Sequence, residues 1–469
     1  MCTTITIDNG VIMFENDTIA AISTALSEGG IGIIRLSGSE AVEICDKVYK
    51  GKNKISDVES HTIHYGHIYE DDRVLDEVMV SVMRAPRSYT KEDVVEINCH
   101  GSVFLQKEIL SLLFKNGARP AEPGEFTKRA FLNGRIDLSQ AESVMDVISS
   151  QNEFAANNSI RQLEGFLKNR IISLREKLIF EIAYIESALD DPEHISLDDY
   201  GNHLDSVISP IMSDIKKYID SSKDGSFLKN GIRTVIVGKP NVGKSSLLNV
   251  LAKRERAIVT DIPGTTRDTL EEQISFGEFS LHVVDTAGIR ETDDRVEQIG
   301  VKKAISSIDE ADLVLYVVDS SLNLDEEDIQ IMDRIKHQKA IVLLNKSDLE
   351  NAVDEDKIKE YLPDNKIISI SAANHSGVDD LKDEIRSMFF HGEISLNNEV
   401  YITNERQKFL LEESLQSLGR VKQSIEDEMP EDFYSIDLMD AYESLGRIVG
   451  ESVDDDLVNE IFSKFCMGK

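Results

Sequence analysis

The stretch Gly238-Lys-Pro-Asn-Val-Gly-Lys-Ser245 decides the fold of the central part of this chain. It matches the pattern Gly-x-x-x-x-Gly-Lys-Ser/Thr, in which backbone N–H groups face phosphates at the start of a helix. The apolar, β-branched run 232–237 precedes it and indicates a buried strand, and Ser246-Leu-Leu-Asn begins a helical pattern. Strand, loop and helix together predict a P-loop, whose lysine contacts phosphates and whose serine hydroxyl binds Mg²⁺.

Four more motifs lie downstream, in the order that a guanine-nucleotide site requires. The loop Gly264-Thr-Thr266 offers a hydroxyl that completes the Mg²⁺ shell beside the γ-phosphate. Asp285-Thr-Ala-Gly288 ends an apolar strand, so its carboxylate suits an indirect contact to Mg²⁺ and its glycine N–H suits the γ-phosphate. Asn345-Lys-Ser-Asp348 follows the apolar run 340–344, and one carboxylate there accepts two donors from guanine that adenine lacks. Ser371-Ala372 fits the loop that flanks the base.

The composition is typical of a large intracellular protein. A chain of 469 residues exceeds the usual size of one core and predicts two or three domains. Its four cysteines are scattered, which disfavours disulfides and zinc and predicts a cytoplasmic location. We expect no membrane-spanning segment and no targeting peptide. The net charge of −35 disfavours general nucleic-acid affinity, so an RNA substrate would need a local basic patch or a basic partner.

Residue periodicity divides the rest of the chain into three regions. From residue 17 to about 132 short alternating runs predict strands at 31–36, 61–65, 77–83 and 94–98, followed by an apolar helix at 103–114. Helical patterns cover 138–222 and resume at 405–465, on either side of the nucleotide-binding motifs. A helical bundle interrupted by an inserted domain is the economical interpretation.

Long strings outside these motifs identify a family. They are Gly29-Gly-Ile-Gly-Ile-Ile-Arg-Leu-Ser-Gly38, Pro86-Arg-Ser-Tyr-Thr-Lys-Glu-Asp-Val-Val-Glu-Ile-Asn-Cys-His-Gly101, the stretch from Arg119-Pro-Ala-Glu-Pro-Gly-Glu-Phe to Arg135-Ile-Asp-Leu138, and Cys466-Met-Gly-Lys469. Over nearly its whole length the chain resembles the tRNA-modification GTPases known as MnmE or TrmE.

The resemblance implies an α/β multidomain fold. It implies a mixed α/β domain at 17–132 that binds tetrahydrofolate and dimerises, a helical bundle domain in two parts at 133–225 and 393–469, and an inserted Ras-like P-loop GTPase domain at 226–392. As a homodimer, joined in a heterotetramer by the FAD-dependent partner MnmG, such proteins add a carboxymethylaminomethyl or aminomethyl group to C5 of the wobble uridine of certain tRNAs. The one-carbon donor is 5,10-methylenetetrahydrofolate, and 5-formyltetrahydrofolate is a related ligand.

Motifs and resemblance together predict the GTP contacts. The predicted residues are Gly238, Asn241, Val242, Gly243, Lys244, Ser245, Ser246, Thr260, Asp261, Ile262, Pro263, Gly264, Thr265, Thr266, Asp285, Thr286, Ala287, Gly288, Asn345, Lys346, Ser347, Asp348, Ser371 and Ala372, with Ser245 and Thr266 as the magnesium ligands.

The resemblance alone implies two further elements of hydrolysis. It implies a potassium ion beside the nucleotide, held by Asn241, Thr260, Ile262 and Thr265, where it offsets charge that an arginine finger neutralises in other GTPases. It also implies that Glu297 orients the attacking water. From the residues alone, Asn241 is more typical of a turn with unusual backbone angles, and Glu297 of an exposed helix start.

For folate, the resemblance implies contacts from Arg35, Glu96, Arg135 and Lys469 to the pterin and glutamate parts of the ligand. Guanidinium and ammonium groups suit the glutamyl carboxylates, and the carboxylate suits the donor edge of a pterin. Most relatives have lysine where Arg135 stands. Taken individually, each of the four is more often part of an ordinary surface ion pair. Cys466 has no histidine nearby in sequence, so we expect it to be a buried apolar cysteine rather than a nucleophile.

Two other functions remain to be weighed. A ribosome-assembly or signalling GTPase would need the same nucleotide motifs but has no use for residues 17–132, so folate binding discriminates between them. A folate enzyme with an inactive nucleotide domain is disfavoured, because every element for hydrolysis is present. The identity of the tRNAs, and whether glycine or ammonium supplies the amine, stay open.

Overall fold

The structure is a computed structural model that describes residues 6–8, 11–13, 17–254, 272–284, 308–390 and 401–468. The chain forms two compact units, each described by itself below. The first unit comprises residues 1–145, 162–180 and 442–469, and the second comprises residues 146–161 and 181–441. The nucleotide motifs all belong to the second unit and the proposed folate residues to the first.

The first unit is built around a seven-stranded, mostly antiparallel sheet with the order β5-β6-β7-β8-β4-β3-β9. The predicted strands correspond to β4, β6, β7 and β8, where alternating residues favour extended chain, and β6 begins at Thr62, one residue later than predicted. The bounds are β3 (Ile19–Ile22), β4 (Gly29–Ser37), β5 (Tyr49–Gly51), β6 (Thr62–Glu70), β7 (Arg73–Met83), β8 (Val94–Gly101) and β9 (Arg119–Pro120). A separate antiparallel pair joins β1 (Thr6–Asp8) and β2 (Val11–Met13).

Helices α1 (Ala41–Val48) and α2 (Val103–Lys115) contribute buried side chains to the same core as one face of this sheet. The predicted helix at 103–114 is α2, whereas α1 and the short 3₁₀ helix η1 (Ile55–Asp57) were not predicted. Because side chains alternate across a strand, Arg35, Glu96 and Ser81, which are register partners on β4, β8 and β7, share the other face. The sheet therefore presents a polar row on the face opposite its helices.

The same unit contains α3 (Glu125–Leu132), most of α4 (Leu138–Ser149), the first part of α6 (Phe166–Asp190), the last part of α15 (Asp432–Val449) and α16 (Asp455–Ser463). A small apolar core joins Ala130 of α3, Leu138 of α4 and Phe462 of α16. Segments more than 300 residues apart in sequence therefore fold together, and the last residues of the chain lie on the N-terminal part.

The second unit holds a six-stranded sheet with the order β11-β12-β10-β13-β14-β15. Only β11 is antiparallel to its neighbour. The parallel strands are almost continuously apolar, as expected of a sheet covered on both faces. The bounds are β10 (Ile232–Val237), β11 (Glu272–Ser275), β12 (Ser280–Val283), β13 (Leu313–Asp319), β14 (Ala340–Asn345) and β15 (Lys366–Ser369).

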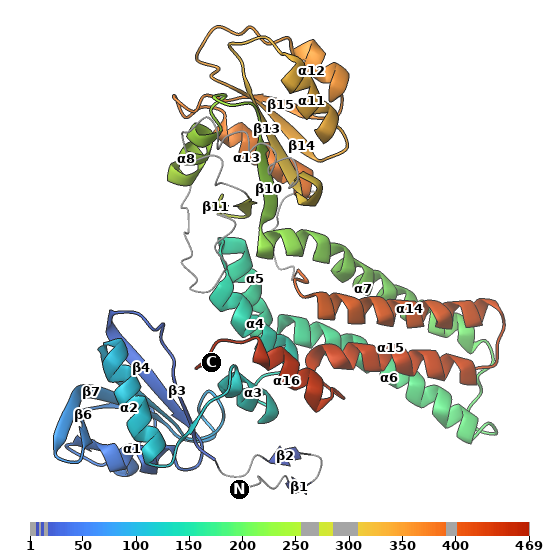
Figure 1. The fold of residues 1–469 in the computed structure, drawn as a ribbon. Coiled ribbons are helices and arrows are strands. Elements are labelled where there is room, and N and C mark those ends of the chain that lie inside the picture. The colour runs from blue at the N-terminus through green and yellow to red at the C-terminus, as the bar shows by residue number, and fades with distance from the viewer. Residues whose placement is uncertain are drawn as a thin grey trace. The chain divides into compact units, whose positions relative to one another are not determined.

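Helices cover both faces of this sheet (Figure 1). The core on one face includes side chains of α8 (Lys244–Arg254) and α13 (Val378–Phe389). The core on the other includes those of α11 (Glu326–Ile335) and α12 (Glu355–Tyr361), with the 3₁₀ helix η2 (Ile308–Glu310) at its edge. This is the P-loop α/β architecture that the motifs predict, in which ligands bind at the carboxyl ends of the strands.

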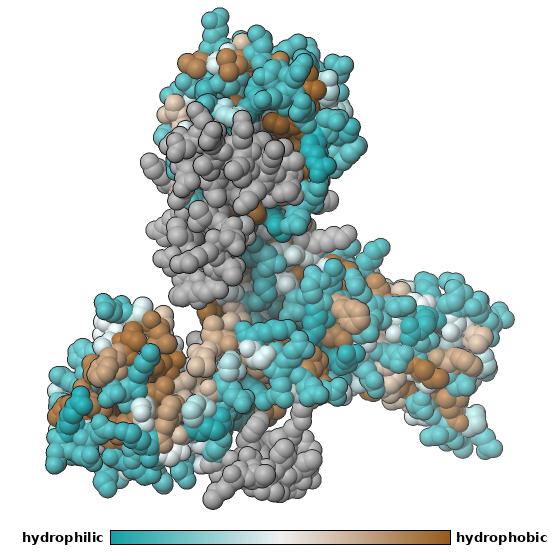
Figure 2. All heavy atoms as spheres, viewed as in Figure 1, coloured by the Kyte–Doolittle hydropathy of each residue, from teal (hydrophilic) through white to brown (hydrophobic). Residues whose placement is uncertain are grey.

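The remaining helices of the second unit pack from both sides of the nucleotide-binding segment. They include α5 (Glu153–Leu163), α7 (Tyr200–Asn230) and α14 (Glu405–Glu426), and α7 contacts α14. Asn158 of α5 exchanges hydrogen bonds with the backbone of Tyr401, and Asn152 donates to the carbonyl of Leu228. The helical stretches before and after the insertion therefore pack together, as predicted. Hydrophilic residues cover most of the visible face of both units (Figure 2).

Candidate functional site

The P-loop connects β10 to α8 through backbone angles that need particular residues. Gly238 and Gly243 have φ of +153° and +99°, and Asn241 has φ of +63°. A Cβ atom on Gly238 would lie 2.4 Å from the carbonyl oxygen of Val317, and one on Gly243 would lie 2.1 Å from Nδ2 of Asn345. Both glycines are therefore required by close approach, and Asn241 is of a type that tolerates the left-handed region.

Lys244 is held against this loop. Its Nζ donates to the carbonyl oxygens of Gly238 at 2.9 Å and Lys239 at 2.7 Å. The ammonium is thus positioned over the loop, where a phosphate of a bound nucleotide would meet it together with the N–H groups at the start of α8. Ser245 is the next residue of the helix, which places its hydroxyl at the same end.

Lys239, a residue of the P-loop, anchors the loop to the start of α11. This contact was not predicted. Its Nζ lies 2.7 Å from Oδ2 of Asp325 and 2.6 Å from Oδ2 of Asp328. Asp328 is almost fully buried and also accepts a hydrogen bond from the hydroxyl of Tyr316 at 2.9 Å. Asp325 and Asp328 form a capping box at the start of α11. The spacing of Asp325 and Asp328 before an apolar helix is a sequence pattern from which the capping box could have been predicted. Their contact with Lys239 could not be predicted from the sequence.

Asn345 joins the P-loop to the base-recognition motif. Its Nδ2 donates to the carbonyl oxygen of Val242 at 2.8 Å, and its Oδ1 accepts from the N–H of Ala372 at 3.2 Å. The side chain is buried, with 2% exposed. One amide therefore fixes three loops relative to one another, which is a structural reason for an asparagine at this position.

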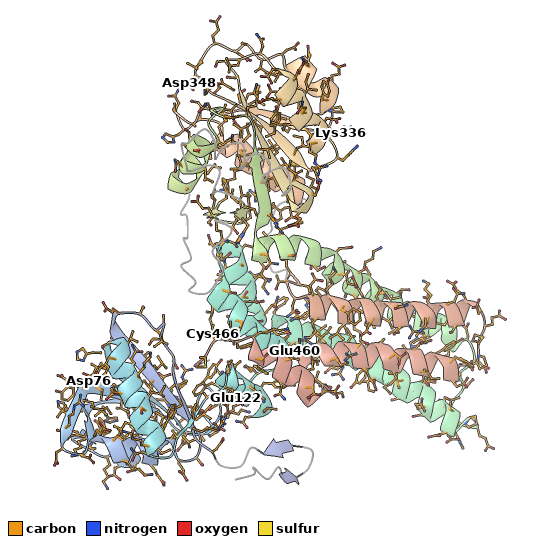
Figure 3. All side chains as sticks on the ribbon, viewed as in Figure 1. Asp76, Glu122, Lys336, Asp348, Glu460 and Cys466 are labelled. Carbon is orange, nitrogen blue, oxygen red and sulfur yellow. The ribbon has the colours of Figure 1, made fainter. Side chains whose placement is uncertain are left out.

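The carboxylate of Asp348 lies at the surface, at the end of the sheet where β14 finishes (Figure 3). The hydroxyl of Ser371 donates to its Oδ1 at 2.5 Å, which leaves the other oxygen to accept donors from a base. Lys346 is held by Asp319, 2.5 Å from its Nζ. Burial alone would raise the pKa of Asp319, but hydrogen bonds from Lys346 and Ser321 outweigh it and hold that pKa below its ordinary value.

Several predicted site residues lie outside the described residues. They are Thr260, Asp261, Ile262, Pro263, Gly264, Thr265, Thr266, Asp285, Thr286, Ala287, Gly288, Glu297 and Lys469. The P-loop residues and those at 345–348 and 371–372 are brought to one end of the second unit's sheet.

In the first unit, Arg35 and Glu96 form an ion pair on the polar face of the sheet. Nε and Nη2 of Arg35 both lie 2.8 Å from Oε1 of Glu96, and the two side chains are 15% and 22% exposed. The Arg35 guanidinium carbon also lies 5.5 Å from the ring centre of Tyr89 and 5.6 Å from that of Phe126. The guanidinium carbon of Arg135 lies 4.7 Å from the same Tyr89 ring. Tyr89 thus connects two of the proposed folate residues.

The segment after α16 reaches this pair. The carbonyl oxygen of Gly468 accepts hydrogen bonds from Ser23 Oγ at 3.1 Å and from Arg35 Nη1 at 3.4 Å. Gly468 has φ of +83°, and a Cβ there would lie 2.3 Å from the carbonyl oxygen of Ile22. The N–H of Gly124 donates to the carbonyl oxygen of Cys466 at 3.3 Å. The expectation that Cys466 is buried was wrong: it is exposed, because the segment lies on the surface beside the loop that contains Glu122 (Figure 3).

A buried ionic network next to this site was also missed. Arg129, whose side chain is 3% exposed, contacts Asp17 at 2.7 Å, Glu125 at 3.0 Å and Glu92 at 3.2 Å. Burial alone would raise the pKa of Glu125, but a hydrogen bond from Arg119 and the charge of Arg129 hold it below its ordinary value. The network fixes the loop that carries Tyr89 to α3. No sequence pattern indicated that Asp17, Glu92 and Glu125 meet at Arg129.

Two kinds of feature are absent from the described ranges. No group of three or more His, Cys, Asp or Glu side chains in them is placed to hold a metal ion. No helix in the same ranges is both long and apolar enough to cross a bilayer.

The fold and the loop geometry define a P-loop GTPase. The N-terminal part, residues 18–135, matches the family model described as GTP-binding protein TrmE N-terminus, and residues 138–466 match the MnmE helical domain. On these matches and on the relatives that follow, the chain belongs to the MnmE (TrmE) family of tRNA modification GTPases.

Three curated relatives carry the description tRNA modification GTPase MnmE. The protein of Lachnoclostridium phytofermentans is 54% identical, that of Acetivibrio thermocellus 48% and that of Bacillus subtilis 46%, each over 97% of this chain and 100% of the relative. Among solved structures, Aquifex aeolicus Era bound to GDP and AlF4⁻ is 28% identical over 40% of this chain and 66% of that one, with a TM-score of 0.27. The chain is therefore a GTP-hydrolysing enzyme of tRNA modification, with GTP as substrate and magnesium as its cofactor.

Proposed function

We propose that this GTPase, with an FAD-dependent partner of the MnmG type, adds a carboxymethylaminomethyl or aminomethyl group to C5 of the wobble uridine of certain tRNAs. Full-length similarity to tRNA modification GTPases supports the proposal, since it covers the N-terminal unit as well as the nucleotide motifs. The single observation that carries it is the Arg35–Glu96 pair joined to the carbonyl of Gly468, a constellation that nucleotide hydrolysis does not need.

For GTP, we propose that the P-loop binds the phosphates and that Asp348 reads guanine, with the nucleotide contacts given by the sequence. The backbone cradle and Lys244 support the phosphate contacts. Serine and threonine hydroxyls suit Mg²⁺, a hard cation that takes oxygen ligands, so Ser245 and Thr266 would hold it beside the β- and γ-phosphates. Bound there, magnesium neutralises charge that develops on the phosphates.

Two proposals concern the hydrolysis step. Asn241, Thr260, Ile262 and Thr265 would hold a potassium ion, and the exposed Asn241 side chain in the P-loop supports this. Its left-handed backbone is also typical of a tight turn, and the potassium dependence of hydrolysis distinguishes the two interpretations. Glu297 would orient the attacking water, a role that rests on the family.

For the one-carbon donor, we propose that the first unit binds a tetrahydrofolate, either 5,10-methylenetetrahydrofolate or 5-formyltetrahydrofolate, through Arg35, Glu96, Arg135 and Lys469. A carboxylate beside guanidinium groups suits the donor edge of a pterin and the carboxylates of its glutamate. The position of Gly468 supports a contact from Lys469, the residue that follows it.

We further propose that the protein acts as a homodimer, in a heterotetramer with the MnmG-type protein, in the cytoplasm where its tRNA substrate is made and used. The chain's charge of −35 supports a need for a basic partner surface, because RNA affinity depends on neutralising phosphates.

Mass spectrometry of tRNA nucleosides from a strain lacking the protein tests the proposal. Loss of the modified uridine, restored by the wild-type chain but not by an Arg35→Gln variant, is the expected result. A ribosome-assembly or signalling GTPase would leave the nucleosides unchanged, and that outcome would refute the proposal. Profiles of ribosomal subunits from the same cells would then identify the alternative.

A further inference from the structure

A basic pocket lies in the first unit beside the proposed folate residues. It has a volume of about 420 Å³ and is formed where β6 begins, where β7 ends and where the following loop passes the segment after α3. Its lining consists of His61, Met83, Pro86, Arg87, Ser88, Tyr89, Lys91 and Arg135. None of the sequence motifs assigned a role to His61, Arg87 or Lys91.

The charge of this basic pocket is opposite to that of the chain. Arg87, Lys91 and Arg135 are cationic and no carboxylate is among the lining residues, although the chain carries a net charge of −35. Within the part of the chain that the structure describes, none of the three permanent cations is paired with a carboxylate. A local positive potential of this kind attracts an anionic ligand.

The carboxylates that follow Lys91 most closely in sequence are already engaged. Glu92 contacts Arg129 at 3.2 Å and accepts a hydrogen bond from Ser37 at 2.7 Å. Asp93 contacts Arg84 at 3.2 Å, and Glu96 is paired with Arg35. Each of these acids faces a cation outside the basic pocket, so they do not neutralise it.

Two of the cations are held in position by uncharged groups. Lys91 Nζ donates to the carbonyl oxygen of Gly134 at 3.1 Å, which leaves its other two hydrogens for a ligand. The guanidinium of Arg135 lies over the Tyr89 ring at 4.7 Å, and the Tyr89 hydroxyl is within 2.9 Å of Thr127 Oγ1. A stacked guanidinium keeps its N–H donors at the edge for carboxylates. Met83 and Pro86 add apolar surface suited to methylene groups.

The basic pocket continues from the proposed folate site, since Tyr89 and Arg135 belong to both. Arg35 lies over the same Tyr89 ring at 5.5 Å. A ligand whose pterin lies at Arg35 and Glu96 and whose first glutamate meets Arg135 would therefore extend its far end toward Lys91 and Arg87. We propose that this basic pocket binds the γ-linked polyglutamate tail of the folate, a flexible chain with one further carboxylate on each added residue.

This inference rests on the proposed folate function, and a comparison of two ligands separates the two. Calorimetry at low salt would measure the affinity of the full-length protein for 5-formyltetrahydrofolate with one glutamate and with five. We expect the pentaglutamate to bind about tenfold more tightly, because each exposed charge pair contributes modestly and several act together. Equal affinities would overturn the inference and leave the folate proposal intact, whereas binding of neither ligand would overturn both.

Variants locate the effect. The double variant Arg87→Gln/Lys91→Gln should lower pentaglutamate affinity to the monoglutamate value and leave monoglutamate affinity unchanged. A control, Arg73→Gln/Lys115→Gln, removes the same charge elsewhere on this unit, where neither residue lines the basic pocket. It should retain the tenfold preference, and an equal loss in both variants would refute the pocket as the cause.

An RNA phosphate is the competing occupant, and fluorescence anisotropy with tRNA distinguishes it. The double variant should bind tRNA as the wild type does. A fall in tRNA affinity with the pentaglutamate preference unchanged would assign the basic pocket to RNA and overturn the inference. Because both substituted side chains are exposed, the melting temperature should not change, and a GTP hydrolysis assay confirms that the rest of the protein is intact.

Discussion

Nη1 of Arg35 donates a hydrogen bond to the carbonyl oxygen of Gly468, 3.4 Å away, across 433 residues of sequence. Ser23 donates to the same oxygen at 3.1 Å. The last described residue of the chain is thereby fixed beside the Arg35–Glu96 pair of the first unit. These two hydrogen bonds are the basis for the prediction that this segment contributes to folate binding.

Replacing Gly468 by alanine should detach this segment without changing any charge. Gly468 has φ of +83°, and the new Cβ would lie 2.3 Å from a backbone oxygen of Ile22 that cannot easily move. The left-handed conformation alone costs a non-glycine residue about 1–2 kcal/mol. We expect roughly tenfold weaker binding of 5-formyltetrahydrofolate in calorimetry, with basal GTP hydrolysis unchanged.

Gly419→Ala is the matched control, because a Cβ at Gly419 meets no atom within 4 Å. It should bind folate as the wild type does. Deletion of residues 465–469 should go further and abolish tRNA modification. Full folate affinity in both the Gly468→Ala variant and the deletion would contradict a role for this segment.

Asp348→Asn should change the nucleotide preference from GTP to xanthosine triphosphate. An amide presents a donor where guanine also presents donors, whereas xanthine offers an oxygen acceptor there. An unsatisfied polar group that the bound base covers costs about 1–3 kcal/mol, and two such contacts predict at least about a 30-fold loss of GTP affinity. Titrations with fluorescent analogues of both nucleotides provide the measurement. Unchanged GTP affinity would remove Asp348 from base recognition.

Asn241→Ala should abolish potassium stimulation of hydrolysis and leave nucleotide affinity nearly unchanged, because the phosphate cradle consists of backbone N–H groups. Alanine is disfavoured at φ of +63°, so Asn241→Gly is the control that keeps the backbone and removes the amide. Hydrolysis rates in potassium and sodium buffers are compared. If either variant responds to potassium as the wild type does, the proposed site is wrong.

Glu297→Ala should slow hydrolysis by about 10²-fold or more without changing GTP affinity, as expected when a group that positions water is lost. A single-turnover assay separates the chemical step from product release. A wild-type rate would exclude Glu297 from the mechanism.

The sequence predicted what local patterns encode. Apolar alternation gave β4, β6, β7 and β8, and the P-loop motif gave β10 and the start of α8, because both depend on neighbouring residues. It did not give contacts made across long separations. The support of Lys239 by Asp325 and Asp328, and the Arg129 network, depend on how loops meet after folding. No periodicity encodes those contacts.

Cys466 shows the same limit in a single residue. The prediction that it is buried used the average behaviour of cysteine, but its exposure depends on where the last segment lies. That position is set by Gly124, whose Cβ would meet Phe465 at 2.8 Å, and by the partners of Gly468. The average behaviour of cysteine therefore predicted the wrong environment for Cys466.

Alkylation of the native protein tests the environments of Cys45, Cys99 and Cys466. Burial, with a further contribution from the charge of Asp76, raises the pKa of Cys99 to about 11, and burial raises that of Cys45 still further. Because the thiolate is the nucleophile, Cys99 at pH 8 has roughly one reactive molecule in a thousand, and its thiol is also covered. Cys466 is exposed and should react first with iodoacetamide, by at least about 100-fold over Cys45 and Cys99. Peptide mapping by mass spectrometry follows each site, and the guanidinium-unfolded protein, in which all three should react at similar rates, is the control. Comparable labelling of Cys45 or Cys99 in the native protein would show that the cores around them open far more often than this structure implies.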